Sequence, residues 1–165
     1  MNSDQVLEIV NEQKRKRRDA KKWLRRVYYQ TLRVEAEERA LRVIEQRVNN
    51  AVGKMESDGA SVDRSQSSRR REAALVDYAQ KNEEFEIEAM KLAKVKHETM
   101  ALISKIGDER LEKIAERRYV DCLSWRDVEK IEAFSHAHMM RLHIDILNKT
   151  AAILERLPKK KEVQL

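Results

Sequence analysis

Apolar residues recur every three or four positions along two long stretches that fill the first two thirds of the chain. The first runs from residue 4 to about residue 55 with nothing that ends a helix, and the second stops at Gly107 and Asp108. Between them, residues 57–68 gather Ser, Asp and Gly and offer almost nothing to bury, which is typical of a loop. The pattern therefore predicts two long helices that pair in antiparallel fashion. The predicted seam positions are Leu24, Val27, Thr31, Val34, Glu38, Leu41, Ile44, Val48, Ala51 and Met55, and then Leu75, Tyr78, Asn82, Phe85, Ala89, Leu92, Thr99, Ile103 and Ile106.

The register of this hairpin follows from the centre of its loop. If the loop is centred near Val62, Leu41 lies near Glu84 and Leu24 lies near Ala101, to within several residues. Two paired helices of this length seldom bury enough surface by themselves. We therefore expect the hairpin to dimerise or to dock on the C-terminal part of the chain.

After the second long helix the apolar periods become shorter and predict three more helices. The first covers residues 110–119. Ser124 can cap the next helix, whose third residue Asp127 can return the bond, and Ser135 can cap the last. A short helix, a turn through residues 132–134 and a second helix that packs back on the first are typical of a helix-turn-helix.

In such a motif the second helix presents its N-terminal side chains to base edges in the major groove of DNA. We expect the base-contacting residues to be His136, Ala137, His138 and Arg141. Two features favour the alternative, a helical hairpin that closes a bundle and binds no DNA. Glu129 stands where such motifs usually hold a small residue, and Glu132 stands where they usually hold an apolar one. Ala133 replaces the common turn glycine.

The composition is typical of a helical protein, and the net charge favours an anionic binding partner. Of the 165 residues 39% are charged, only three are Gly and one is Pro, and the net charge is +6. The predicted class is all-α: a long antiparallel hairpin over residues 1–106, a helix-turn-helix unit over residues 107–157, and a basic tail over residues 158–165. The positive charge favours nucleic acid as a partner.

One basic cluster lies early in the first helix, where nine Lys and Arg residues between positions 14 and 26 face a single acid. We expect phosphate contacts from Lys14, Arg15, Lys16, Arg17 and Arg18, because the predicted register brings them opposite residues 104–111 at the base of the helix-turn-helix. The alternative is an ordinary solvated helix face. Whether the second cluster, Arg69, Arg70 and Arg71, binds anything is left open.

The sequence gives little support for a disulfide, a metal site, a membrane span or a catalytic site. Cys122 is the only cysteine, which excludes an intrachain disulfide and favours a reducing compartment. His136, His138 and His143 do not have the spacing of three or four that paired metal ligands on a helix need. No apolar run reaches the roughly 20 residues of a membrane span. Because no catalytic or cofactor-binding motif occurs, we expect no enzyme, no cofactor, no metal and no small-molecule substrate.

Residues 114–147 resemble the helix-turn-helix, similar to region four of sigma factors, of small phage transcriptional activators of the RinA and ArpU type. The resemblance depends on Arg118-Tyr119, Ser124-Trp125, Phe134-Ser135 and Arg141-Leu142-His143, in that order. It implies a phage or prophage activator that binds promoter DNA and assists RNA polymerase at late, packaging or lysis genes.

The resemblance also implies roles for single residues. His136, His138 and Arg141 would face bases, and Ser124 and Arg126 would lie near phosphates. The expected place is the cytoplasm of a bacterial host, at its nucleoid. Two alternatives stay open: a small DNA-packaging subunit of the terminase type, and a coiled-coil interaction protein that binds no DNA. A homodimer is also open, as are the operator, the controlled genes and the surface that would meet RNA polymerase.

Overall fold

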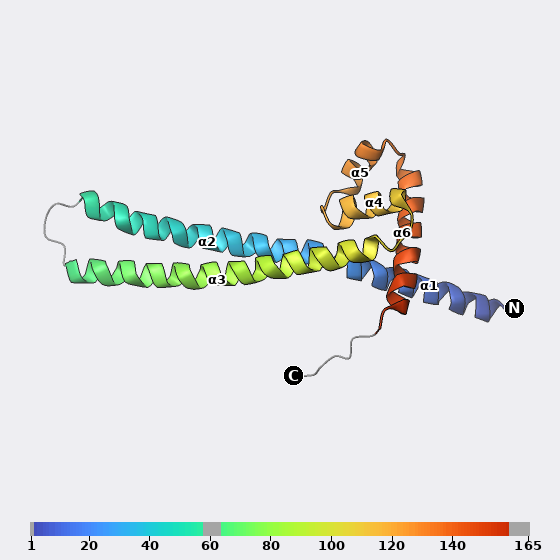
Figure 1. Cartoon of the computed structure of the whole chain (residues 1–165), viewed down its shortest axis with the longest axis horizontal. Helices are drawn as coiled ribbons and strands as arrows, with labels where there is room; N and C mark the ends of the chain where they lie inside the picture. Colours follow the sequence, from blue (N-terminus) through green and yellow to red (C-terminus); the bar gives the residue numbers. More distant parts are fainter. Residues whose placement is uncertain (1, 58–63, 159–165) are drawn as a thin grey trace. The chain divides into compact units, whose positions relative to one another are not determined.

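The computed structural model describes residues 2–57 and 64–158, and the side chains of residues 2–50 and 68–158. Every regular element in these ranges is an α-helix (Figure 1), so the predicted all-α class is confirmed. The helices are α1 (Ser3–Leu24), α2 (Arg26–Ser57), α3 (Arg64–Ile103), α4 (Glu109–Tyr119), α5 (Trp125–Glu132) and α6 (His136–Arg156). None of the helices within the described ranges is both long and apolar enough to cross a membrane.

The helices form two compact units. The first combines the described residues up to Tyr28 with those from Val95 onward, and the second, here called the hairpin unit, is Tyr29–Lys94. The sequence-based prediction divided the chain differently, because it placed α1 in the hairpin. In the structure α1 packs against α6, and α6 also packs against α4 and α5.

The hairpin unit pairs α2 with α3 in antiparallel fashion (Figure 1). Gln30 donates to the Glu88 carboxylate at 2.6 Å, and Glu37 forms an ion pair of 2.5 Å with Lys81. These partners on α3 lie about two helical turns earlier than the predicted register placed them. The loop prediction was also too long, because α3 already begins at Arg64.

Most residues at the predicted seam positions of the hairpin unit are half-buried, as expected for positions between two paired helices. Val34, Leu41, Ile44 and Val48 are half-buried. Leu75 is an exception: its side chain is 46% exposed, so its assignment to the seam was wrong. The predicted seam positions Ala51 and Met55 lie outside the residues whose side chains are described.

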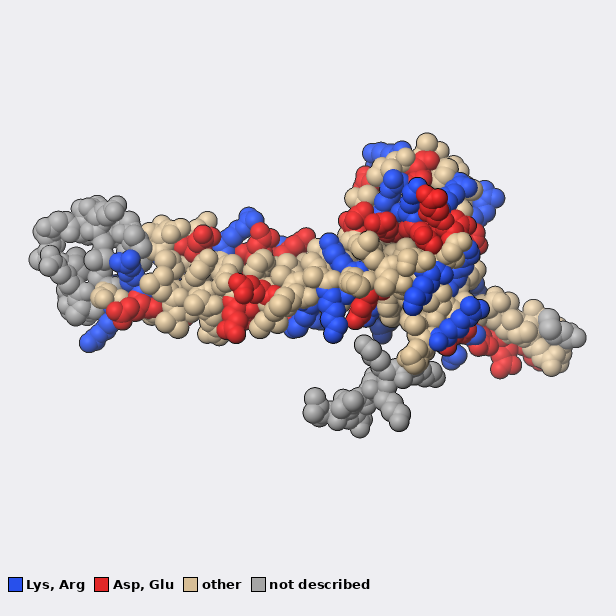
Figure 2. Space-filling view, in the orientation of Figure 1, with Lys and Arg blue, Asp and Glu red and all other residues tan. Residues whose placement is uncertain are grey.

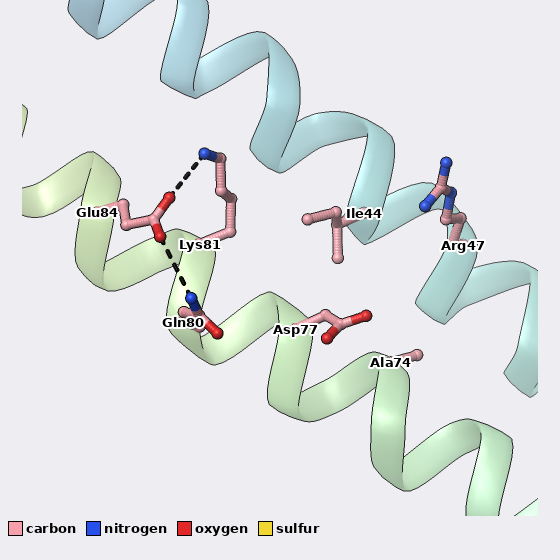
Figure 3. Close-up of a pocket in the computed structure, with 7 residues that line it drawn as sticks. All are labelled: Ile44, Arg47, Ala74, Asp77, Gln80, Lys81 and Glu84. Carbon is pink, nitrogen blue, oxygen red and sulfur yellow. Dashed lines mark hydrogen bonds and ion pairs between the residues drawn. The ribbon is translucent and has the colours of Figure 1, made fainter.

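A shallow groove of about 230 Å³ lies between the two helices of the hairpin unit. Figure 3 shows Ile44 and Arg47 on α2 across from residues of α3. On the α3 side, Lys81 lies beside two carboxylates, of Glu37 and then Glu84, which raise the pKa of its ammonium group. The groove is lined by Ile44, Arg47, Ala74, Asp77, Gln80, Lys81 and Glu84.

The predicted uninterrupted first helix is broken once, at Arg25, between α1 and α2. The break is slight, because Arg25 keeps right-handed dihedral angles (φ −73°, ψ −2°) and its N–H still donates to the Lys21 carbonyl at 3.0 Å. The Trp23 carbonyl accepts a hydrogen bond from the Arg26 side chain at 3.2 Å.

The core of the first unit gathers apolar side chains from α1, α3, α4, α5 and α6. Leu24, Ile114, Val128, Met139 and Ile146 are each fully buried. Burying such a side chain contributes roughly 1.5–3 kcal/mol. This core fixes α5 and the N-terminal half of α6, which carry the predicted site.

Candidate nucleic-acid interface

Local capping sets the ends of α5 and α6. The Ser124 hydroxyl accepts from the Asp127 N–H at 3.2 Å, and the Ser135 hydroxyl accepts from the His138 N–H at 3.4 Å. Both predicted caps are confirmed. Asp127 also bonds back to Ser124, but its carboxylate accepts from the Ser124 hydroxyl at 2.5 Å and not from the Ser124 backbone N–H. The start of each helix is thus fixed by its own sequence.

The turn between α5 and α6 depends on a left-handed residue. Ala133 has φ 54° and ψ 40°, a conformation that glycine adopts far more easily than alanine. The Phe134 N–H then donates to the Glu129 carbonyl at 3.1 Å, which closes the end of α5. The alanine that replaces the usual turn glycine therefore keeps the turn but at a cost in strain.

Glu129 and Glu132, the two glutamates at positions where helix-turn-helix motifs usually hold other residues, both have partners. Glu132 forms an ion pair with Arg117 of α4, and its side chain is only 17% exposed. Glu129 lies 2.6 Å from His136 Nδ1. A polar group at a mostly buried position is tolerated when it is paired. These glutamates thus link α5 to α4 and to α6.

His138 is also tied to its surroundings. Arg110 Nη2 donates to His138 Nε2 at 2.8 Å, because a guanidinium can only donate. The His138 ring meets the Phe134 ring edge-on, with 4.9 Å between centroids, and Arg110 lies over Phe134 at 4.3 Å. His138 is half-buried by this cluster. Its Nε2 atom is occupied and not free for a base.

The remaining predicted base-contacting residues lie on the surface of α6. Ala137 and Arg141 are exposed, and the His136 side chain is 72% exposed although it contacts Glu129. Within the described ranges no hydrogen bond or ion pair involves the Arg141 side chain. The face that the sequence assigned to DNA is therefore open to a partner, apart from His138.

Behind this face lies a buried polar pair. Tyr119 Oη and His143 Nε2 are 2.7 Å apart, and the His143 ring lies 4.5 Å from that of Trp125. Burial, together with the cations Lys21 and Arg118, lowers the pKa of His143 to about 4, and burial raises the pKa of Tyr119 to about 12. Both groups are neutral at pH 7. His143 is thus a core residue of the unit.

The first part of the basic cluster, residues 14–18, lies at the other end of α6. Lys16 forms ion pairs with Glu155 at 2.8 Å and with Glu12 at 3.0 Å, and these carboxylates raise the pKa of its ammonium group. Glu155 is about 28 Å along α6 from His136. No described contact joins the cluster to residues 104–111, as the predicted register had required. Lys14, Arg15 and Arg18 are exposed, and Arg17 is half-buried.

A different pair of arginines lies beside Ser124. A pocket of about 330 Å³ at the start of α5 is lined by Arg25, Tyr28, Arg118, Tyr119, Cys122, Ser124 and Trp125. Arg118 donates to the Leu123 carbonyl at 2.6 Å and lies over the Trp125 ring. Its buried Nε has no hydrogen-bond partner among the described residues. Sequence reasoning missed both arginines, because only the packing of α1 brings Arg25 to α5.

Figure 2 shows positive and negative side chains mixed on the visible surface of the first unit. Exposed Arg126 lies two residues after Ser124, in the first turn of α5. In the described part of the chain, no three His, Cys, Asp or Glu residues form a cluster that could hold a metal ion. Comparison of the chain with protein-family models, curated proteins and solved structures finds no match.

Proposed function

We propose that the chain binds double-stranded DNA through the N-terminal half of α6 and acts as a transcription activator of the phage type. The observation that carries the proposal is the open face of α6. Arg141 and Ala137 are exposed on a helix that Ser135 caps and α5 braces. An exposed arginine near the start of such a helix can bind guanine O6 and N7 together.

The start of α5 supplies the phosphate contacts in this proposal. Ser124 and Arg126 are exposed there, and the N-terminus of a helix attracts anions. The pocket beside Ser124 adds the guanidinium groups of Arg25 and Arg118 to the same place. Phosphate contacts of this kind orient the protein on the duplex without selecting sequence.

The regulatory part of the proposal depends on the resemblance of residues 114–147 to RinA- and ArpU-type activators. Such a protein would bring RNA polymerase to a promoter. Transcription from a bound promoter by purified host polymerase, with and without the protein, tests this part. A protein that binds the promoter but leaves transcript levels unchanged would instead support a packaging subunit.

The DNA contact is tested by substituting Arg141. Fragments selected from a host or phage genome supply the specific duplex, and a scrambled duplex serves as reference. Arg141→Ala should weaken binding to the specific duplex by ~1–3 kcal/mol and spare the scrambled one. Arg156→Ala, at the exposed far end of α6, is the matched control. Equal losses on both duplexes would reject a base contact by Arg141.

The basic cluster of α1 is tested by its salt dependence. Replacing Lys14, Arg15 and Arg18 with Gln should weaken binding to all duplexes alike and reduce the slope of log affinity against log salt by up to about three. The slope is measured by fluorescence anisotropy over a salt series. An unchanged slope would place the cluster outside the DNA contact.

A further inference from the structure

Arg141 has apolar neighbours on the exposed side of α6. His143 and Ile146, which are buried, lie on the opposite side of the helix. At about 100° per residue, Arg141 lies almost directly across α6 from that buried side. Ala137, about one turn before Arg141, and Ile144, about one turn after it, are exposed as well. An arginine therefore lies between two apolar residues on one exposed surface.

Ile144 places a large apolar side chain on this surface. It is 42% exposed, whereas Met140, about one turn earlier, is half-buried and packs against the core. A single exposed isoleucine is common on protein surfaces and by itself indicates no partner. The informative point is its place, because Ile144 lies about 60° around α6 and about 4.5 Å along its axis from Arg141. A surface that binds Arg141 therefore also meets Ile144.

Base edges in the major groove of DNA match this pair of side chains. Guanine O6 and N7 accept two hydrogen bonds from an arginine, and the C5 methyl of thymine offers an apolar contact. Successive base pairs are about 3.4 Å apart, so about 4.5 Å along α6 corresponds to between one and two base pairs. A guanine and a nearby thymine thus present two acceptors and a methyl group at the spacing of Arg141 and Ile144.

We infer that Ile144 contacts the C5 methyl of a thymine that lies one or two base pairs from the guanine bound by Arg141. This inference rests on the proposed function and adds to it the bases that α6 selects. The binding energy comes from removing the isoleucine and the methyl group from water, and cytosine, which lacks the methyl, gives less apolar contact. Ile144 is then a specificity-determining residue of the DNA contact.

Asp145, the exposed acidic residue next to Ile144, agrees with a base contact rather than a backbone contact. It lies about 40° around α6 from Arg141, on the side away from Ile144. A carboxylate is repelled by phosphates, whereas it can accept a hydrogen bond from cytosine N4 in the major groove. With Asp145 on its surface, this turn of α6 fits base edges better than it fits the DNA backbone.

The experiment uses the full chain and the specific duplex selected from a host or phage genome. The thymines of that duplex are replaced one at a time with uracil, which differs from thymine only in lacking the C5 methyl. Binding is measured by fluorescence anisotropy. One replacement should weaken binding by about fourfold, as expected for the loss of one buried methyl group, and the replacements elsewhere should have no effect.

The position of that thymine is checked against the guanine bound by Arg141. Replacing each guanine with 7-deazaguanine removes N7, and the guanine in question is the one whose replacement weakens the wild-type chain but not Arg141→Ala. The sensitive thymine should lie one or two base pairs from it.

Variants of Ile144 then assign the methyl contact to this residue. Ile144→Ala should bind the thymine and uracil duplexes equally, and Ile144→Val, which keeps a branched apolar side chain, should retain most of the preference for thymine. Alanine is a good helix former, so the exposed position tolerates the change. Met100→Ala removes an apolar side chain of similar exposure, 47%, from α3 and is the matched control.

The outcomes separate this inference from the proposed function. A chain that selects no specific duplex would overturn both. A chain that binds a specific duplex but is insensitive to every uracil replacement would overturn the inference alone, and would leave Ile144 to a protein partner. So would a uracil effect that persists in Ile144→Ala, or an Ile144→Ala chain that weakens on the thymine and uracil duplexes by the same factor.

Discussion

Protonation of His143 should destabilise the fold at mildly acidic pH. The side chain is 8% exposed, hydrogen-bonds Tyr119 and faces the cations Lys21 and Arg118. Its folded-state pKa of about 4, lowered mainly by burial, lies below the usual 6.5 of the unfolded chain. The unfolded chain therefore binds the proton first as the pH falls. The contribution to stability is fully present above pH 6.5 and is lost as the pH falls toward 4.

The magnitude follows from the two pKa values of this one group. Between pH 7 and pH 5 the difference in proton binding lowers the free energy of unfolding by about 2 kcal/mol. That is a large part of the roughly 5–15 kcal/mol that stabilises a typical domain. The effect should therefore be visible in an ordinary denaturation experiment.

Urea unfolding at pH 7 and pH 5, followed by circular dichroism at one protein concentration, measures the loss. His143→Gln is the comparison, because its amide can still hydrogen-bond Tyr119 but does not titrate. We expect wild type to lose about 2 kcal/mol more than the variant between the two pH values. Titration of the other histidines is common to both proteins and cancels in the comparison.

The same loss in wild type and in His143→Gln would refute this reasoning. So would an NMR titration in which the His143 ring protonates near pH 6.5 in the folded protein. Either result would mean that the ring is more hydrated than its 8% exposure indicates.

Two further predictions concern the turn and the ion pair that hold α5. Ala133→Gly should raise the free energy of unfolding by about 1 kcal/mol, because glycine adopts the left-handed conformation without strain; an unchanged urea midpoint would contradict this. Arg117→Ala should cost about 2–3 kcal/mol by leaving the mostly buried Glu132 unpaired. Arg117→Met with Glu132→Leu should recover most of that stability, and a double variant as unstable as the single one would show that the charge is not the cause.

The parts that the sequence predicted are those set by residues close together in the chain. Ser124 and Ser135 cap their helices because a side-chain oxygen can reach an N–H three residues on. The seam from Val34 to Val48 follows in the same way from helical periodicity. Leu75 was misassigned because Ala74, its neighbour, takes the place on the half-buried side of α3.

The parts that it missed depend on partners far apart in the chain. Periodicity tells which face of α1 is apolar but not that α6 covers it, so neither the pairing of Lys16 with Glu155 nor the approach of Arg25 to Ser124 could be predicted. The hairpin register was wrong by about two turns for a related reason. The sequence offers only the midpoint of a loop as a guide to the register, whereas side-chain pairs such as Glu37 and Lys81 fix it.

Contacts inside the protein set His138 apart from the other predicted base-contacting residues of α6. Arg110 with Phe134 holds His138, so that ring must give up a contact inside the protein before it can meet a base. His136 contacts Glu129 through Nδ1 alone and stays 72% exposed. Arg141 has no such contact to give up within the described ranges, and its guanidinium can bind a base edge with two hydrogen bonds. Binding through Arg141 leaves the internal contacts of α6 intact. Under the proposed function, sequence preference should therefore depend most on Arg141. Substitution of His138 should act mainly on stability, because its ring contacts Arg110 of α4 and Phe134.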